Sequence, residues 1–304
     1  MPLTGVRVLD CSRLLPGGHC TRLLADAGAS VLKVEPPGGD PLRRMAGGQV
    51  MFERLHHGKE CVTLDWGSED DRTRLWREIE AADVLVEGFR PGVMERAGFG
   101  YAVLAERNPR LIYCAITGYG SGGPLVTRAG HDLNYLARSG ALALMPRSAD
   151  GTPVIPGIQL ADQAGGERAA FLIAAALAAR AQHGHGTRLE ISLTEVMRGW
   201  TDLHRAVGRA GAAGLPLTGS APCYRVYRAA DGWLSVAALE PAFWRTFCQA
   251  LGREDLAGRQ FDGSAVVDVQ GVLVTRTRGA WMAIFDGQDV CVEPCLDVDE
   301  LETS

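Results

Sequence analysis

A chain of 304 residues is long enough to bury one large α/β core together with a smaller module, without covalent staples. Its charged fraction of 22% and net charge of −5 exclude a strongly basic surface, so a nucleic acid is not an expected partner. Its eight cysteines include no Cys-x-x-Cys pair, which argues against a disulfide or zinc framework and predicts reduced thiols in a cytoplasmic protein.

The apolar segments of the sequence argue against a membrane protein. The first residues are strand-like, at positions 6–9, and lack the basic region and apolar stretch of a signal peptide. The longest apolar run covers residues 169–179, lies between Arg168 and Arg180, and is too short to span a bilayer. We therefore expect a soluble protein with no membrane partner.

The first half of the chain alternates short β-branched runs with helical stretches. Strands are expected at residues 6–9, 30–34, 84–86 and 111–116, and helices near residues 19–27 and 70–81. This alternation is typical of βαβ units, whose parallel strands form one sheet. The predicted fold class is α/β, with a large Rossmann-like parallel-sheet domain and a second, smaller α+β domain.

A long Ala-rich helix is expected to begin at Asp162 and to extend to about Ala181, before a strand over residues 187–193. Asp162 would then lie at the positive end of the helix, which would favour its ionised form. Its simplest structural role would be that of a helix N-cap.

The composition changes to Gly, Ala, Pro and Ser over residues 211–220, which predicts a linker. Beyond it a strand is expected at residues 233–236, and helices at 241–251 and 279–285. The expected organisation is a large α/β domain at 1–210, a linker at 211–222, and a small α+β domain at 223–304.

Two chemically different proton acceptors follow the last expected strand of the first half. One is His131, in Gly130-His131-Asp132-Leu133-Asn134-Tyr135, and the other is Asp162. An imidazole and a carboxylate that converge from separate loops would flank one carbon acid, so that one removes a proton and the other returns it on the opposite face. A racemase requires this arrangement, although His131 would also serve as an ordinary loop histidine bonded to backbone.

Short motifs surround these two residues along the chain. They include Leu23-Leu24-Ala25-Asp26-Ala27-Gly28-Ala29, Lys33-Val34-Glu35-Pro36-Pro37, Glu87-Gly88-Phe89-Arg90-Pro91-Gly92, Thr117-Gly118-Tyr119-Gly120 and Ala238-Leu239-Glu240-Pro241. Each motif alone is a weak match. Their ordered succession resembles the family III CoA-transferases (CaiB/BaiF), specifically the α-methylacyl-CoA racemase branch.

This resemblance implies catalytic roles for three residues. His131 and Asp162 would be the two α-proton bases, and Glu240 would orient and charge the imidazole of His131. Because Glu240 lies in the small module, the resemblance implies that it comes from the partner subunit of an interlocked homodimer. In the transferase branch the carboxylate of Asp162 would instead be the nucleophile that carries the acyl group as an anhydride.

The same resemblance predicts which residues contact the CoA part of the substrate. They are Arg43, Lys59, Gly88, Arg90, Asp132 and Tyr135. Arginine suits phosphate because its planar fork binds two oxygens, although each cation would also serve as an ordinary surface charge. Asp132 would alternatively stabilise its own loop through backbone hydrogen bonds. No metal and no separate cofactor are expected, since CoA enters as part of the substrate.

Two other patterns formally match a dinucleotide-binding loop and a metal site, and we assign neither function to them. The run from Gly118 to Gly123 fits G-x-G-x-x-G, but Pro124 follows and no helix is expected there, so we interpret it as a glycine loop over the active site. His183 and His185 lack the acidic or cysteine neighbours of a metal site.

The favoured interpretation is an acyl-CoA racemase or epimerase acting on a 2-methylacyl-CoA-like thioester by two-base proton transfer. Backbone N–H groups near Asp162, at the helix start, would stabilise the enolate oxygen. The alternatives are a CoA-transferase that uses Asp162 as nucleophile and a non-racemising CoA- or pantetheine-thioester-binding biosynthetic protein. Members of the resembled family continue beyond the equivalent of Ser304, so a C-terminal return segment is expected to be missing and the site to be more open.

Overall fold

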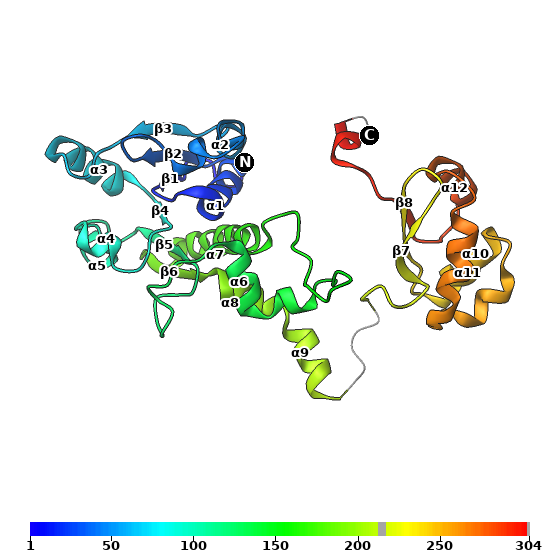
Figure 1. The fold of residues 1–304 in the computed structure, drawn as a ribbon. Coiled ribbons are helices and arrows are strands. Elements are labelled where there is room, and N and C mark those ends of the chain that lie inside the picture. The colour runs from blue at the N-terminus through cyan, green and yellow to red at the C-terminus, as the bar shows by residue number, and fades with distance from the viewer. Residues whose placement is uncertain (212–216, 303–304) are drawn as a thin grey trace. The chain divides into compact units, whose positions relative to one another are not determined.

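The computed structural model describes residues 1–211 and 217–302, which form two compact units, Met1–Leu203 and His204–Ser304 (Figure 1). Composition predicts a domain boundary after residue 210, a little later than this division. Residues 212–216 of the predicted linker lie outside the described residues.

A six-stranded parallel sheet forms the centre of the first unit, with strand order β3-β2-β1-β4-β5-β6. The strands are β1 (Arg7–Asp10), β2 (Ser30–Glu35), β3 (Glu60–Thr63), β4 (Val84–Glu87), β5 (Ile112–Thr117) and β6 (Thr187–Ser192). Val8 of β1 pairs with Val31 on one side and with Val84 on the other. The predicted α/β fold class is therefore confirmed.

The helices of the first unit cover both faces of this sheet. They are α1 (Leu14–Asp26), α2 (Gly48–Leu55), α3 (Glu69–Ala81), α4 (Val93–Arg96), α5 (Tyr101–Arg107), α6 (Asp132–Ser139), α7 (Leu160–His183), α8 (Leu193–Trp200) and α9 (Asp202–Arg209), the last of which crosses into the second unit. Because successive strand residues point to opposite faces, Val84 and Val86 join one core cluster and Leu85 joins another. Every residue of β4 and β5 is buried, as expected for central parallel strands.

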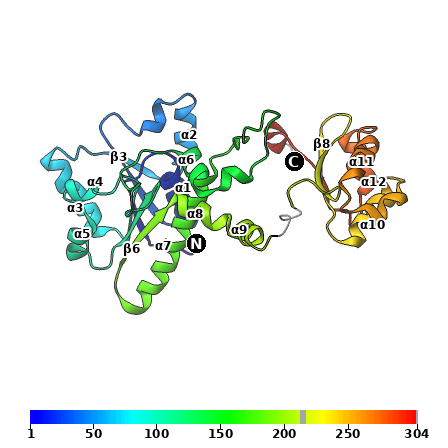
Figure 2. The same cartoon turned by 60° about the horizontal axis from the view of Figure 1, so that its bottom comes forward.

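Helices α1 and α7 lie side by side on one face of the sheet (Figure 1 and Figure 2). A glycine permits this close approach: a Cβ atom added at Gly166 would lie 2.7 Å from the carbonyl oxygen of Pro16. The first part of α7, which carries Asp162, thereby packs against the first turn of α1.

Two helix boundaries differ from the sequence expectation. Helix α1 begins at Leu14, before the expected start near residue 19, because Pro16 is tolerated in a first turn where the N–H groups have no partner within the helix. Helix α7 begins at Leu160, so Asp162 is its third residue and not its N-cap, which is Gln159. As predicted, no helix opens after the glycines at 118–123.

The second unit has its own antiparallel sheet, β7 (Tyr224–Arg228), β8 (Trp233–Ala237) and β9 (Val292–Pro294), in the order β7-β8-β9. Helices α10 (Pro241–Ala250), α11 (Val266–Leu273) and α12 (Arg278–Phe285) complete it. Trp244, Phe247 and Trp281 are buried in a core that belongs to this unit alone. Within the described ranges, no helix of either unit has both the length and the apolar character needed to cross a membrane.

Candidate active site

A cavity of about 330 Å³ lies at the carboxyl ends of the central strands of the first unit. Its walls include Arg13 and Leu14 after β1, Gly88 and Arg90 after β4, and Thr117 at the end of β5. The chain reverses its strand order between β1 and β4. Ligands of open α/β sheets bind in the crevice at such a switch point, so this cavity is the candidate active site.

Both predicted bases line this cavity. His131 is the exposed residue directly before α6, and its backbone N–H donates to Oδ1 of Asn134 at 3.0 Å. Asp162 is half-buried in the first turn of α7. The sequence placed them thirty-one positions apart, and the fold brings them to one cavity because the two helices begin at it.

The carboxylate of Asp132 connects the starts of the two helices. Its Oδ1 accepts the backbone N–H of Ala161 at 2.7 Å and that of Asp162 at 3.0 Å. The Asp132 carboxylate therefore binds the backbone of α7, which is a different role from the predicted contact with the substrate. The substrate contact stays a prediction.

The environment of Asp162 reverses the expectation drawn from the helix start. Burial, followed by the negative charge of Asp132, raises the pKa of Asp162 to about 7. The expectation that the helix dipole would favour the ionised carboxylate is wrong, because desolvation and a neighbouring like charge outweigh a dipole effect of about 1 kcal/mol. Near neutral pH both protonation states are populated, which is the condition for a group that must take up and release a proton.

The donors expected for an enolate oxygen at the start of α7 are already used. The N–H groups of Ala161 and Asp162 bond to Asp132, and that of Gln163 bonds to the carbonyl of Gln159 at 3.0 Å. The expectation that they would stabilise an enolate is therefore wrong for this conformation. In the described part of the chain, the N–H groups of Asp132 and Leu133, in the first turn of α6, have no acceptor.

Tyr135 forms a supporting wall of the cavity. Its hydroxyl donates to the carbonyl of Gly130, its ring lies 5.2 Å from that of Tyr119, and burial raises its pKa to about 12. A Cβ atom at Gly118 would lie 2.3 Å from the Tyr135 ring, so only glycine fits there. The glycine loop that follows β5 thus packs on α6 and contributes to the cavity wall.

Three exposed arginines also line the cavity: Arg13, Arg90 and Arg128. Across residues 1–211 and 217–302, none of the three has a carboxylate within ion-pair distance. Sequence reasoning identified Arg90 and missed the other two. The position of Arg13 just after β1, at the switch point, was the available signal.

A second cavity of about 280 Å³ adjoins the first through Arg13 and Phe89, which line both. The guanidinium of Arg13 lies 4.6 Å from the centroid of the Phe89 ring. Pro36, Pro37 and Trp66 supply much of the remaining wall, so this second cavity is largely apolar. The two cavities together offer room for an elongated ligand.

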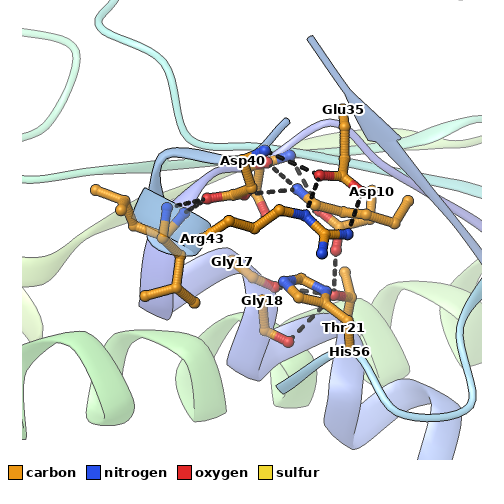
Figure 3. Close-up of polar contacts among 12 residues, drawn as sticks. Asp10, Gly17, Gly18, Thr21, Glu35, Asp40, Arg43 and His56 are labelled. Atoms are coloured by element: carbon orange, nitrogen blue, oxygen red, sulfur yellow. Dashed lines mark hydrogen bonds and ion pairs between the residues drawn. The ribbon is translucent and has the colours of Figure 1, made fainter. Parts of the chain in front are cut away.

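The other two predicted CoA-binding cations lie elsewhere in the first unit, in a cluster of charged groups formed by Asp10, Lys33, Glu35, Asp40, Arg43 and Lys59, several of which are labelled in Figure 3. The ammonium of Lys59 is fully buried and donates to the carbonyl of Gly18 at 2.9 Å and to Oγ1 of Thr21 at 2.7 Å. Arg43 reaches across to Glu35 in an ion pair of 2.8 Å (Figure 3). Their contact with CoA stays a prediction, and it would require both cations to exchange these partners.

This cluster fixes the loop that follows β1. The buried Lys33 ammonium lies 3.3 Å from Oδ2 of Asp40 and donates to the carbonyl of Ser12. Oδ1 of Asp40 in turn accepts the N–H of Leu14 at 3.4 Å. Leu14 has a positive φ of 62°, a backbone conformation that costs energy for a non-glycine residue and persists only when its surroundings hold it.

Glu240 belongs to the second unit, where it is exposed and precedes the first residue of α10. Its predicted pairing with His131 stays a prediction.

Comparison with known proteins identifies the family. The family described as CoA-transferase family III matches residues 3–304. The chain belongs to the family III CoA-transferases. The resemblance drawn from the sequence motifs is thereby confirmed.

Relatives within this family carry two kinds of name. Human α-methylacyl-CoA racemase is 35% identical over 313 residues, covering 99% of this chain and 79% of the relative. Acetyl-CoA:oxalate CoA-transferase of Acetobacter aceti is 32% identical over 323 residues, covering 98% of this chain and 82% of the relative. Family membership therefore establishes an enzyme class that acts on acyl-CoA thioesters and leaves the reaction to be argued from the site.

Solved structures of family members share the fold. Rv3272 from Mycobacterium tuberculosis superimposes with a TM-score of 0.87 at 30% identity, covering 100% of this chain and 86% of its own. A CaiB/BaiF family protein from Brucella suis gives a TM-score of 0.86 at 27% identity, covering 100% and 86% respectively.

Proposed function

We propose that this family III member is an acyl-CoA racemase or epimerase that acts at the α-carbon of a 2-methylacyl-CoA-like thioester. The observation that carries the proposal is that two different bases, His131 and Asp162, line one cavity from the starts of two helices. A pKa of about 7 at Asp162 adds support, because a catalytic acid–base group works best with a pKa near the working pH.

The reaction removes one proton from the α-carbon and adds one proton to its opposite face. The neutral imidazole of His131 or the carboxylate of Asp162 removes the α-proton, and the electron pair of the C–H bond moves into the thioester carbonyl to form an enolate. The other base, in its protonated form, then delivers a proton to the opposite face of the same carbon. No redox partner is needed, and the ratio of the two epimers follows from their relative stability.

The enolate oxygen needs hydrogen-bond donors aimed at its developing charge. The first N–H groups of α6, at Asp132 and Leu133, are available next to His131 within the described residues. They also lie at the positive end of the α6 dipole. We assign the enolate oxygen to this helix start in place of the start of α7.

The cavity walls suit the two ends of an acyl-CoA substrate. Unpaired arginines such as Arg13 and Arg90 would bind phosphate oxygens, and CoA enters as part of the substrate, not as a separate cofactor. Apolar side chains, among them Val126 and Leu193, would contact the acyl chain. The proposal includes a homodimer in which Glu240 of the partner subunit approaches His131 and stabilises its charged form.

CoA transfer is the second candidate, because transferases are found among relatives of similar identity. In that reaction the Asp162 carboxylate attacks the thioester carbonyl, a mixed anhydride forms and the CoA thiolate leaves. The CoA thiolate next attacks the Asp162 side of the anhydride, which releases the original acid and leaves an aspartyl-CoA thioester. A free carboxylate, which Arg128 in the cavity wall would hold, attacks this thioester, and the returning CoA thiolate then forms the new acyl-CoA and frees Asp162. The raised pKa of Asp162 disfavours this candidate, since part of the carboxyl group is protonated at neutral pH.

Proton NMR in D₂O separates the candidates. We expect wild-type protein to remove the α-proton signal of 2-methylacyl-CoA without any added acid, and we expect Asp162→Asn to abolish inversion of the α-carbon. A chain that exchanges no α-proton with several acyl chains, but moves CoA to an added carboxylate, would establish the transferase instead. If neither reaction occurs while acyl-CoA binds, the protein is a thioester-binding member of the family.

A further inference from the structure

We infer that Asp132 is a positioning residue for the reaction: its carboxylate joins the starts of α6 and α7, and thereby sets the place of Asp162 relative to His131 and holds a negative charge beside the Asp162 carboxyl group. This inference rests on the proposed two-base function and concerns the side-chain carboxylate of Asp132, which the proposed mechanism places on no reacting atom; only the backbone N–H of Asp132 is assigned there to the enolate oxygen. The carboxylate of Asp132 would then fix the position of another protein group, whether or not it also contacts the substrate.

The geometry of the bridge supports this role. One oxygen of Asp132 accepts two consecutive N–H groups of α7, at 2.7 Å from Ala161 and 3.0 Å from Asp162. Asp132 is itself the residue after His131 and the first residue of α6. The backbone that carries one base is therefore held by the side chain next to the other base.

The intervening chain does little to fix this distance. Residues 145–159, which lead into α7, are mostly exposed loop and turn, with one isolated bridge between Arg147 and Pro153. Ala161 is fully buried, so loss of its acceptor would leave an N–H group that water does not reach. A shift of about 1 Å at a reacting group lowers rates by about 10²-fold, so a bridge at this point has a large effect on catalysis.

The charge of Asp132 has a second consequence for the same site. Several other groups face Asp162 or its surroundings: His131 and Tyr135 from α6, Arg13, Arg90 and Arg128 from the cavity loops, Tyr119 after β5, and the pair of His19 on α1 with Glu167 on α7. The pKa of Asp162 is raised by burial and, among charged groups, by Asp132, which is not one of these. Asp132 thus both places the carboxyl group and weakens its acidity.

Two substitutions separate the bridge from the charge. Asp132→Asn keeps an oxygen that accepts both N–H groups but removes the negative charge. Because the ionised form of Asp162 then becomes easier to reach, we expect the acid limb of the pH profile for α-proton exchange to move down by about one pH unit. Asp132→Ala removes bridge and charge together, and we expect exchange to fall by about 10²-fold at every pH.

Asp150→Asn is the matched control. Asp150 also accepts a backbone N–H group, that of Thr152 at 3.0 Å, but it does not line the cavity. The control should leave the acid limb and the exchange rate unchanged, and circular dichroism with thermal unfolding should show all three variants folded. An acid limb of Asp132→Asn within 0.2 units of wild type would overturn the inference, as would full activity of Asp132→Ala.

A readout without turnover distinguishes failure of this inference from failure of the proposed function. Carbon-13 labelling of aspartate, with Asp162→Asn as the assignment control, gives the pKa of the Asp162 carboxyl group directly. We expect Asp132→Asn to lower this pKa by about one unit, even in a protein that exchanges no α-proton. Absent exchange in wild type would overturn the proposed function alone, whereas an unchanged Asp162 pKa in Asp132→Asn would overturn the inference alone.

Discussion

Two aspartates of the first unit, the buried Asp10 and the half-buried Asp162, have opposite electrostatic surroundings. Burial by itself would raise the pKa of Asp10, but Lys33, Lys59 and two hydroxyl donors lower it to about 2. Asp162 is also desolvated, yet its strongest charged neighbour is another carboxylate, Asp132, and its pKa is raised to about 7. Nearby cations thus hold one carboxyl group in its ionised form, and without them the other stays able to change its protonation state near neutral pH, as the proposed reaction requires.

The comparison extends to the loops that the two aspartates control. Asp10 accepts hydrogen bonds from Ser12 and Thr21 and belongs to the cluster of Figure 3, which fixes the loop after β1. Asp162 lies where that loop borders the cavity and has no cation within ion-pair distance among the described residues. A rigid, charge-balanced cluster thus supports a cavity wall whose own carboxyl group is left free to change protonation state.

The largest expected effect comes from breaking the charge balance of the structural cluster. Lys33→Met removes a buried ammonium that lies 3.3 Å from Asp40 and 3.8 Å from Asp10, which leaves Asp40 without its cation and Asp10 with Lys59 alone. We expect the free energy of unfolding to fall by about 3–5 kcal/mol in urea denaturation. Arg198→Met breaks the exposed ion pair with Glu195 and should change the free energy of unfolding by less than about 1 kcal/mol. Equal effects of the two substitutions would contradict the assigned roles.

A smaller effect is expected in the pH dependence of stability, to which Asp10 and Asp162 should contribute in different pH ranges. The folded-state pKa of Asp10 lies below its ordinary value of 3.8, so its stabilisation is complete above about pH 4 and is lost as pH falls toward 2. The folded-state pKa of Asp162 lies above 3.8, so its ionisation destabilises the fold increasingly as pH rises from about 4 to 7. Between pH 5 and pH 8 the two groups should therefore behave differently.

Urea denaturation at these two pH values measures the contrast. We expect the stability of Asp162→Asn relative to wild type to increase by about 2 kcal/mol from pH 5 to pH 8. The deficit of Asp10→Asn should be the same at both pH values, because Asp10 stays ionised in the folded and unfolded chains over this range. A pH-independent difference for Asp162→Asn would show that its carboxyl group is not perturbed.

Features encoded by local pattern were predictable from the sequence. The buried strands β4 and β5 are apolar runs up to their last residues, Glu87 and Thr117, and their alternation with helices indicates a parallel sheet. His131 and Asp162 were found through motifs that resemble those of a family. Both residues lie in the connection from β5 to β6, which leaves the sheet at the carboxyl end of β5, where the cavity lies.

Features that depend on burial and long-range contacts were not predictable. The bridge from Asp132 to α7 joins residues thirty positions apart, and no periodic pattern marks it. The sign of the pKa shift at Asp162 was wrong because desolvation is a tertiary property that a helix start does not reveal. Lys59 resembled a surface cation, as most lysines are, and its full burial depends on the partners that enclose it.

The measurement that tests the central claim most directly is stereospecific α-proton exchange in D₂O, with each enantiomer of 2-methylacyl-CoA supplied separately to wild type, His131→Gln and Asp162→Asn. Two bases on opposite faces predict a crossed pattern: each variant exchanges the proton of one enantiomer only, the two variants act on different enantiomers, and inversion falls by about 10²–10⁴-fold in both. Retention of exchange with the same enantiomer in both variants, or inversion at the wild-type rate in either, would contradict the account.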